Sequence, residues 1–176
     1  MNQSVAIVTG ASLGIGRATA IRVAGDFSAV VVVARSSETL QDTASKAQAA
    51  GGPLALALDL REPASAELVV KQTLDRYGRI DALINVAGAV LQTDLFAMID
   101  AEWNDGLSLT FHDARRLTIN AWEALKSARG AVVLTSGATA LAPKAALAAV
   151  GTINAAIAVR SEKAFASQAV CRDISS

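Results

Sequence analysis

Apolar and polar positions along the chain form blocks of two kinds. Short runs of consecutive apolar residues, rich in valine, are separated by longer stretches in which apolar positions recur with helical spacing. Continuous apolar strands that alternate with amphipathic helices are typical of a parallel sheet covered on both faces. With right-handed crossovers, the pattern predicts an α/β fold with a doubly wound parallel sheet. The expected strands cover residues 5–9, 30–34, 54–58, 82–85 and 131–135.

Glycine and proline mark the ends of several expected helices. Proline begins the stretch 63–77 and Gly78 follows it, which is the usual asymmetry of a helix. Gly51-Gly52-Pro53 ends the helix expected before it. The expected helices cover residues 17–25, 37–50 and 63–77, a long region of about 101–128, and about 151–169.

A glycine-rich turn lies between the first expected strand and the first helix. Its sequence is Thr9-Gly10-Ala11-Ser12-Leu13-Gly14-Ile15-Gly16. Glycines at this spacing let the backbone bend sharply, approach a pyrophosphate closely and pack the helix tightly on the strand. The first helical amides and the positive end of the helix dipole then face the anion. The turn therefore predicts a site for the phosphates of a dinucleotide.

Composition narrows the possible function classes. Acidic and basic side chains balance at 16 each, without a basic stripe, so we expect no nucleic-acid partner. No strictly apolar run is longer than that of residues 29–34, which is far too short to span a bilayer. One cysteine, Cys171, and one histidine, His112, provide neither a disulfide framework nor a metal site. We expect a single domain over residues 1–176, without a signal peptide or a membrane partner, in the cytoplasm.

Four motifs stand in the order typical of the short-chain dehydrogenases/reductases. The turn at residues 9–16 matches the TGxxxGIG motif of that family, and Asp59-Leu60 matches the acidic position after its third strand. Residues 77–85 match the segment that leads into and forms the fourth strand. Asn85-Val86-Ala87-Gly88 matches the motif NNAG, with Val86 in place of the second asparagine. The chain therefore resembles this family over essentially its whole length.

The resemblance implies a three-layer, Rossmann-like domain that binds NAD or NADP along the C-terminal edge of the sheet. It implies hydride transfer between the nicotinamide and a small-molecule carbonyl or alcohol. It also implies a homodimer or homotetramer built through the fourth and fifth helices, where Ala155, Ala156 and Ala158 would permit close packing. The implied cofactor-binding residues are Gly10, Ser12, Leu13, Gly14, Ile15, Gly16, Asp59, Leu60, Asn85, Ala87 and Gly88.

The end of the second expected strand bears on the choice of cofactor. An acidic residue there would hydrogen-bond the ribose 2′-hydroxyl and favour NAD. This position is about Ala34, and the Arg35 that follows can pair with a 2′-phosphate. Leu13 stands at a position that is often basic in NADP-using relatives, and its apolar side chain weakens the case for NADP. We expect Arg35 to bind cofactor and NADP(H) to be favoured, with NAD(H) as the alternative; a solvated surface arginine is the simpler interpretation.

The catalytic positions of the family carry other residues in this chain. The family works with an Asn, a Ser, a Tyr and a Lys, and the register places these at Thr110, Gly137, Val150 and Asn154. Valine cannot donate a proton, and asparagine carries no charge that would lower the pKa of a neighbour. Ser136 is then the candidate catalytic residue, although strand alternation directs it away from the cleft unless the strand end twists.

Two hypotheses about function remain open at this point. The first is an NADP(H)-dependent oxidoreductase with an atypical active site. The second is a catalytically inactive nucleotide-binding or assembly protein on the same fold. Residues 172–174 resemble the lead into a sixth strand, and the later strands, nicotinamide loop and substrate lid of the family have no counterpart after them. We therefore expect a domain truncated at its C-terminus, with the fifth strand at or near a sheet edge.

Overall fold

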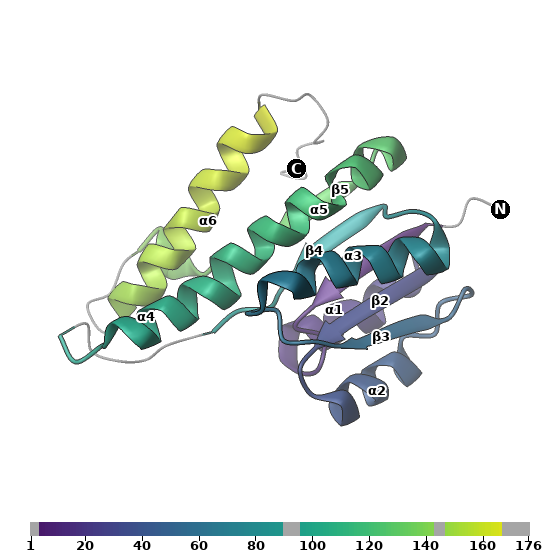
Figure 1. Cartoon of the computed structure of the whole chain (residues 1–176), viewed down its shortest axis with the longest axis horizontal. Coiled ribbons are helices and arrows are strands. Elements are labelled where there is room, and N and C mark those ends of the chain that lie inside the picture. Colours follow the sequence, from purple (N-terminus) through teal and green to yellow (C-terminus); the bar gives the residue numbers. More distant parts are fainter. Residues whose placement is uncertain (1–3, 90–95, 143–146, 167–176) are drawn as a thin grey trace.

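The chain folds into a parallel sheet flanked by helices (Figure 1). The computed structural model describes residues 4–89, 96–142 and 147–166. The strands are β1 (Val5–Thr9), β2 (Ala29–Ala34), β3 (Pro53–Ala57), β4 (Ala82–Asn85) and β5 (Ala131–Leu134). The α-helices are α1 (Gly14–Val23), α2 (Ser37–Lys46), α3 (Pro63–Tyr77), α4 (Asp100–Leu107), α5 (Asp113–Ala128) and α6 (Ala148–Ala166). A π-helix, η1 (Ser108–His112), joins α4 to α5, and a 3₁₀ turn, η2 (Ala138–Ala140), follows β5.

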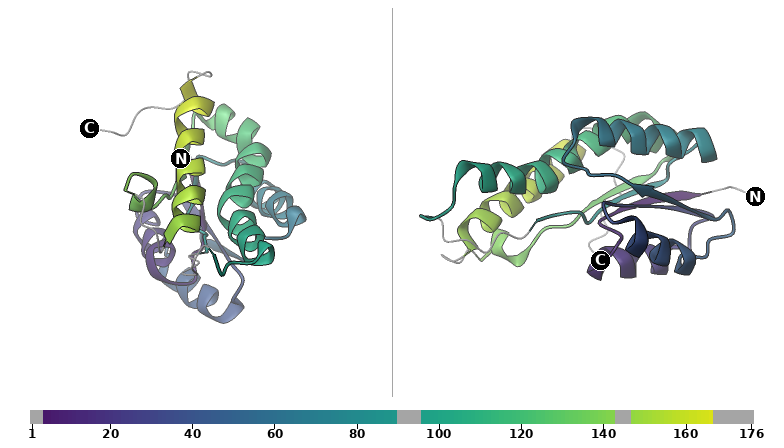
Figure 2. Two further views of the ribbon diagram at one scale, coloured as in Figure 1. Left: turned by 90° about the vertical axis from the view of Figure 1, so that its left-hand side faces the viewer. Right: turned by 60° about the horizontal axis from the view of Figure 1, so that its bottom comes forward.

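The strand order is β3-β2-β1-β4-β5, and every neighbouring pair is parallel. Helices α1 and α2 cover one face of the sheet, and α3 and α5 cover the other (Figures 1 and 2). The order reverses between β1 and β4, where a doubly wound sheet opens a crevice at the carboxyl ends of its strands. The predicted α/β fold is confirmed.

Alternating residues of the central strands build two cores. Ile7 and Val31 are fully buried in the core that includes Leu117 of α5. Val8 and Val32 are fully buried in the other core, which includes Leu40 of α2. Because both faces are covered, every residue of β1 and β2 is buried. This explains the continuous apolar runs of these strands in the sequence.

Most element boundaries agree with the expected ones to within a residue, but three helices differ. Helix α1 begins at Gly14 rather than at residue 17, since the amide of Arg17 already bonds the carbonyl of Leu13 at 3.2 Å. Helix α2 ends at Lys46 instead of residue 50, because Ala47 leaves helical geometry at ψ 68° and is fully buried. Helix α6 begins three residues early, at Ala148.

The long helical region expected over 101–128 is interrupted. The π-helix Ser108–His112 separates α4 from α5, and neither proline nor glycine occurs within it. A π-helix inserts an extra residue per turn and is frequent at functional sites. Its middle residue is Thr110, which the sequence places at a catalytic position of the family.

Helices α4 and α6 lie beyond the end of the sheet that carries the carboxyl ends of the strands (Figure 2). Helix α6 contacts η2, η1 and α4 there. Within the described residues β5 is an edge strand, as expected. The predicted end of the last helix, Cys171 and the lead into a sixth strand at 172–174 lie outside the described residues.

Candidate functional site

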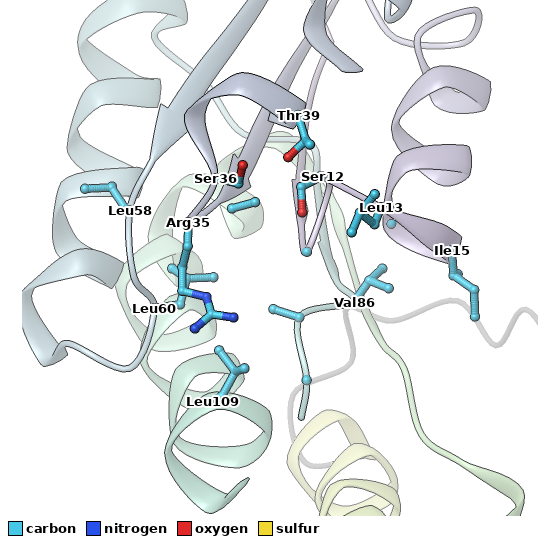
Figure 3. Close-up of a pocket in the computed structure, with 15 residues that line it drawn as sticks. Ser12, Leu13, Ile15, Arg35, Ser36, Thr39, Leu58, Leu60, Val86 and Leu109 are labelled. Carbon is cyan, nitrogen blue, oxygen red and sulfur yellow. The ribbon is translucent and has the colours of Figure 1, made fainter. Parts of the chain in front are cut away.

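A cavity of about 740 Å³ opens at the carboxyl ends of the central strands (Figure 3). The glycine turn after β1 forms one side, and the start of α2 forms another. Segments after β3 and β4 and one residue of the π-helix complete the wall. The lining residues are Gly10, Ser12, Leu13, Ile15, Gly16, Ala34, Arg35, Ser36, Thr39, Leu58, Leu60, Val86, Ala87, Gly88 and Leu109.

Most of the residues predicted to bind a cofactor line this single cavity. The three that do not are Gly14, Asp59 and Asn85. Gly14 shapes the turn at φ 54°, whereas Asp59 is engaged with its neighbour Arg61. Asn85 is 4 % exposed, and neither polar atom of its side chain has a hydrogen-bond partner among the described residues. The cofactor-binding role of all these residues remains a prediction.

Two glycines of the turn occupy places where no side chain fits. Gly10 has φ 66°, and a Cβ there would lie 2.9 Å from the amide nitrogen of Ala87. A Cβ on Gly16 would lie 2.2 Å from the carbonyl oxygen of Gly10. The turn therefore packs directly on the segment after β4 and on its own helix start. This close packing leaves the first turn of α1 open toward the cavity.

The Thr9 hydroxyl connects the ends of β1 and β4. Its Oγ1 accepts hydrogen bonds from the amides of Val86 at 3.1 Å and Ala87 at 3.0 Å. Thr9 itself is fully buried. The glycine turn and the segment after β4, which both line the cavity, are thus held in a fixed relative position.

Polar groups gather where β2 leads into α2. Among the described residues that line the cavity, Arg35 alone has a charged side chain, and it extends toward Leu109 (Figure 3). Ser36 and Thr39 line the same wall. Thr39 Oγ1 is buried and has no hydrogen-bond partner within the described part of the chain. A guanidinium on this wall can pair with a phosphate group.

Thr110, which the sequence register predicts at the Asn position of the family, lies at the centre of the π-helix. Its Oγ1 accepts a hydrogen bond from the amide of Ala89 at 3.1 Å. A Cβ on Gly88 would lie 3.4 Å from the same oxygen. Thr110 therefore fixes the segment after β4 against the π-helix rather than extending into open space.

Gly137 and Asn154, which the sequence register predicts at the Ser and Lys positions of the family, face each other. A Cβ on Gly137 would lie 2.5 Å from Nδ2 of Asn154, which donates instead to Oγ1 of Thr139 at 3.0 Å. Ser136 donates from Oγ to the main-chain oxygen of Asn154 at 3.0 Å. The strand end thus brings Ser136 to helix α6, and its catalytic role remains a prediction. Val150, at the Tyr position, lies one turn earlier on α6.

Comparison with known proteins decides the family. A family model described as short chain dehydrogenase matches residues 4–162. The chain belongs to the short-chain dehydrogenase/reductase family. Members of this family are oxidoreductases that use nicotinamide cofactors.

Curated relatives of this short-chain dehydrogenase/reductase include bacterial reductases. Short-chain reductase protein NovJ of Streptomyces niveus is 36% identical over 115 residues, which are 65% of this chain and 44% of the relative. The 3-oxoacyl-(acyl-carrier-protein) reductase FabG of Escherichia coli is 34% identical over 133 residues, 76% of this chain and 54% of the relative. The chain thus spans about half the length of the curated relatives it matches.

Solved structures agree with the fold. L-sorbose reductase from Gluconobacter frateurii, solved with NADPH and L-sorbose, superposes with a TM-score of 0.87 at 25% identity. The match covers 93% of this chain and 63% of that one. A short-chain dehydrogenase/reductase from Brucella melitensis gives a TM-score of 0.88 at 24% identity, over 96% of this chain and 68% of that one.

Sequence reasoning missed one unusual group of this short-chain dehydrogenase/reductase. Asp113 is 1 % exposed, and its Oδ1 has no hydrogen-bond partner among the described residues. Burial raises the pKa of Asp113 to about 7, and the nearby Arg116 opposes this only in part. A signal was present, because Asp113 lies four residues from both Leu109 and Leu117 on the buried side of the helix.

No group of three or more His, Cys, Asp or Glu side chains in the described ranges could hold a metal ion. None of the helices within those ranges is long and apolar enough to cross a membrane.

Proposed function

We propose that this chain is an NADP(H)-dependent oxidoreductase that reduces a small carbonyl compound or oxidises the corresponding alcohol. The observation that carries the proposal is the cavity wall at Arg35. Arg35 lines the cavity there beside Ser36 and Thr39, and no carboxylate is among the described residues that line the cavity. This arrangement favours a 2′-phosphate over a free 2′-hydroxyl. NAD(H) is the alternative cofactor.

Different parts of the cavity would bind different groups of the coenzyme. Backbone amides at the start of α1 would bind the pyrophosphate, and the wall at Arg35 would bind the 2′-phosphate. When bound, the coenzyme supplies or accepts the hydride. The structure of L-sorbose reductase with NADPH concerns a relative of the same fold and supports the choice of coenzyme by analogy.

On the substrate side, we assign hydrogen bonding to the cluster of Ser136, Thr139 and Asn154. The Thr139 oxygen accepts from Asn154, so the Thr139 hydroxyl hydrogen is available for an oxygen of the substrate. Ser136 reaches the same helix through the main-chain oxygen of Asn154. None of these side chains carries a charge. They would orient a carbonyl rather than act as strong acids.

A second candidate function is nucleotide binding without turnover. Val150 cannot exchange a proton, and Asn154 provides no cation at the Lys position; these two residues favour this candidate. Fluorescence titration with NADPH and NADH tests binding, and NADPH oxidation with a panel of ketones and aldehydes tests turnover. Turnover that falls on Ser136→Ala supports the oxidoreductase. Tight NADPH binding without turnover on any carbonyl would instead support the second candidate.

We also propose a homodimer or homotetramer in the cytoplasm. Ile119 on helix α5 is 55% exposed. The small residues Ala155 and Ala156 of α6 would allow another helix to approach closely. Light scattering measures the mass in solution. A monomer at all concentrations would contradict this assembly.

A further inference from the structure

The loop after β3 forms an apolar wall of the cavity. Leu58 and Leu60 line the cavity, and Leu109 of the π-helix lines it as well. Leu60 is 3 % exposed and Leu109 is 9 % exposed, so both are packed firmly in place. Apolar side chains of this kind suit the flat face of a purine ring better than a phosphate or a ribose.

Asp59 lies between Leu58 and Leu60, and residues close by in the sequence hydrogen-bond to it. The Arg61 amide donates to Oδ1 of Asp59 at 3.0 Å. The Ser65 hydroxyl donates to the main-chain oxygen of Asp59 at 2.7 Å. The bond from the Arg61 amide lies in the turn between β3 and α3 and orients the Asp59 side chain, and the bond from Ser65 joins that turn to the start of α3.

The same arginine connects this loop to a helix far along the chain. The Arg61 guanidinium donates from Nη2 to Oδ2 of Asp105 at 2.9 Å and from Nε to Oδ1, which is the two-pronged geometry of a strong ion pair. Its Nη1 lies 3.6 Å from Oδ1 of Asp59. The Arg116 guanidinium of α5 also donates to the Arg61 carbonyl at 3.4 Å. Hydrogen bonding to Arg61 holds the pKa of Asp105 below its ordinary value, so this carboxyl stays ionised.

Asp105 and Leu109 are one helical turn apart where α4 passes into the π-helix. Arg61 is next to Leu60 in the loop after β3. The ion pair therefore joins the two elements whose leucines line the same end of the cavity. The separation of these walls depends on a contact between residues 44 positions apart in the sequence.

We propose that Arg61 and Asp105 are positioning residues that set the width of the adenine-binding end of the cavity. This inference rests on the proposed coenzyme-binding function. The pair does not line the cavity and would not touch the ligand; it acts through Leu60, Leu109 and the direction of Asp59. Removing the pair would weaken every ligand that carries adenosine, whatever its phosphate pattern.

The test compares two adenosine ligands on three variants. Adenosine monophosphate lacks the 2′-phosphate, and adenosine 2′,5′-bisphosphate carries it. We expect Asp105→Asn and Arg61→Lys to weaken both ligands by a similar factor of about tenfold, because the two-pronged contact is lost. Asp105→Glu, which keeps the charge, should recover much of the affinity. Each affinity is measured by calorimetry well below the unfolding temperature of the variant.

The comparison of ligands separates positioning from a simple charge effect. The charge of Arg35 also contributes to lowering the pKa of Asp105, so loss of that carboxylate alone would strengthen binding of the bisphosphate at Arg35. Selective strengthening of the bisphosphate would therefore overturn the proposal. So would affinities of Asp105→Asn and Arg61→Lys within twofold of the wild type for adenosine monophosphate.

A matched control removes a comparable ion pair elsewhere. Asp75→Asn makes the same carboxylate-to-amide change in the exposed Lys71–Asp75 pair of α3, whose atoms are 2.6 Å apart. It should leave both affinities unchanged. If the wild type binds neither ligand, nor NADPH, the proposed coenzyme-binding function fails and this inference fails with it. If the wild type binds and the Arg61 and Asp105 variants bind equally well, the positioning role alone is refuted.

Discussion

The carboxamide of Asn154 occupies the space that a side chain at Gly137 would need. The Nδ2 atom lies 2.5 Å from the place of a Cβ on Gly137. Gly137 has φ −106° and ψ 154°, an extended conformation that any residue adopts. Its lack of a side chain is therefore a matter of space and not of backbone strain. The two residues, which the sequence register predicts at catalytic positions of the family, are thus complementary in shape.

We expect Gly137→Ser to destabilise the protein by about 1–3 kcal/mol in the presence of Asn154, because the new side chain overlaps the carboxamide. In an Asn154→Ala background the same change should be nearly neutral. Thermal or urea unfolding of the four proteins of this double-mutant cycle measures the coupling. Equal costs of Gly137→Ser in both backgrounds would show that the two positions are independent.

Coenzyme discrimination should depend on Arg35. We expect Arg35→Met to weaken NADPH by about tenfold and to change NADH affinity little, because the lost guanidinium would pair only with the 2′-phosphate. Fluorescence titration with both coenzymes measures the ratio. Arg115→Met removes an exposed arginine of α5 that does not line the cavity, and it should leave the ratio intact. A parallel loss of NADPH and NADH affinity in Arg35→Met would contradict the assignment.

The glycine turn should not tolerate alanine at Gly16. The added Cβ would lie 2.2 Å from the Gly10 carbonyl oxygen, so the turn must shift. We expect lower stability by at least 1 kcal/mol and loss of measurable coenzyme binding. Gly25→Ala is the matched control, since its Cβ would lie 3.6 Å from its nearest neighbour, the Arg22 carbonyl oxygen. Retained NADPH affinity in Gly16→Ala would show that this packing is not needed for the site.

Stability should fall with rising pH because of Asp113. Its pKa is raised from 3.8 to about 7 by burial, so the folded protein keeps a proton that the unfolded chain releases. Raising the pH from about 4 to about 7 therefore favours unfolding, and the loss is on the order of a few kcal/mol. Above pH 7 the loss no longer grows.

Asp113→Asn should remove this dependence and stabilise the protein at pH 8 relative to the wild type. Denaturant unfolding between pH 4 and pH 8 measures both effects. Glu67→Gln removes an exposed carboxylate of α3 as a control and should leave the slope unchanged. A wild-type stability that rises steadily across this range would refute the assignment.

Local chemistry explains which elements could be predicted from the sequence. Helix α3 has the expected bounds because Pro63 starts it and Gly78, at φ 74°, ends it in the left-handed region. The strands β1 and β2 were predictable because both of their faces are buried. Helix α2 ends early although alanine favours helices, because Ala47 and Ala49 are buried by tertiary packing.

The site was predictable where glycine spacing determines the backbone, and less so where side chains meet in space. Thr39 reaches the cavity from the first turn of α2, three residues after Ser36, which no motif of the sequence indicated. The π-helix carries no proline or glycine that would mark it. The contact of Arg61 with Asp105 joins distant segments, so the sequence alone offers no local signal for it.

The hydroxyl of Thr9 lowers the conformational entropy that the cavity loses when a ligand binds. One oxygen atom of Thr9 accepts from two amides of the segment after β4, so that segment and the end of β1 form one rigid unit. The chain loses the freedom of this segment when it folds and has little more to lose when a ligand arrives. A valine of the same shape at position 9 would leave two main-chain donors without a partner. The segment after β4, which lines the cavity, would then become mobile.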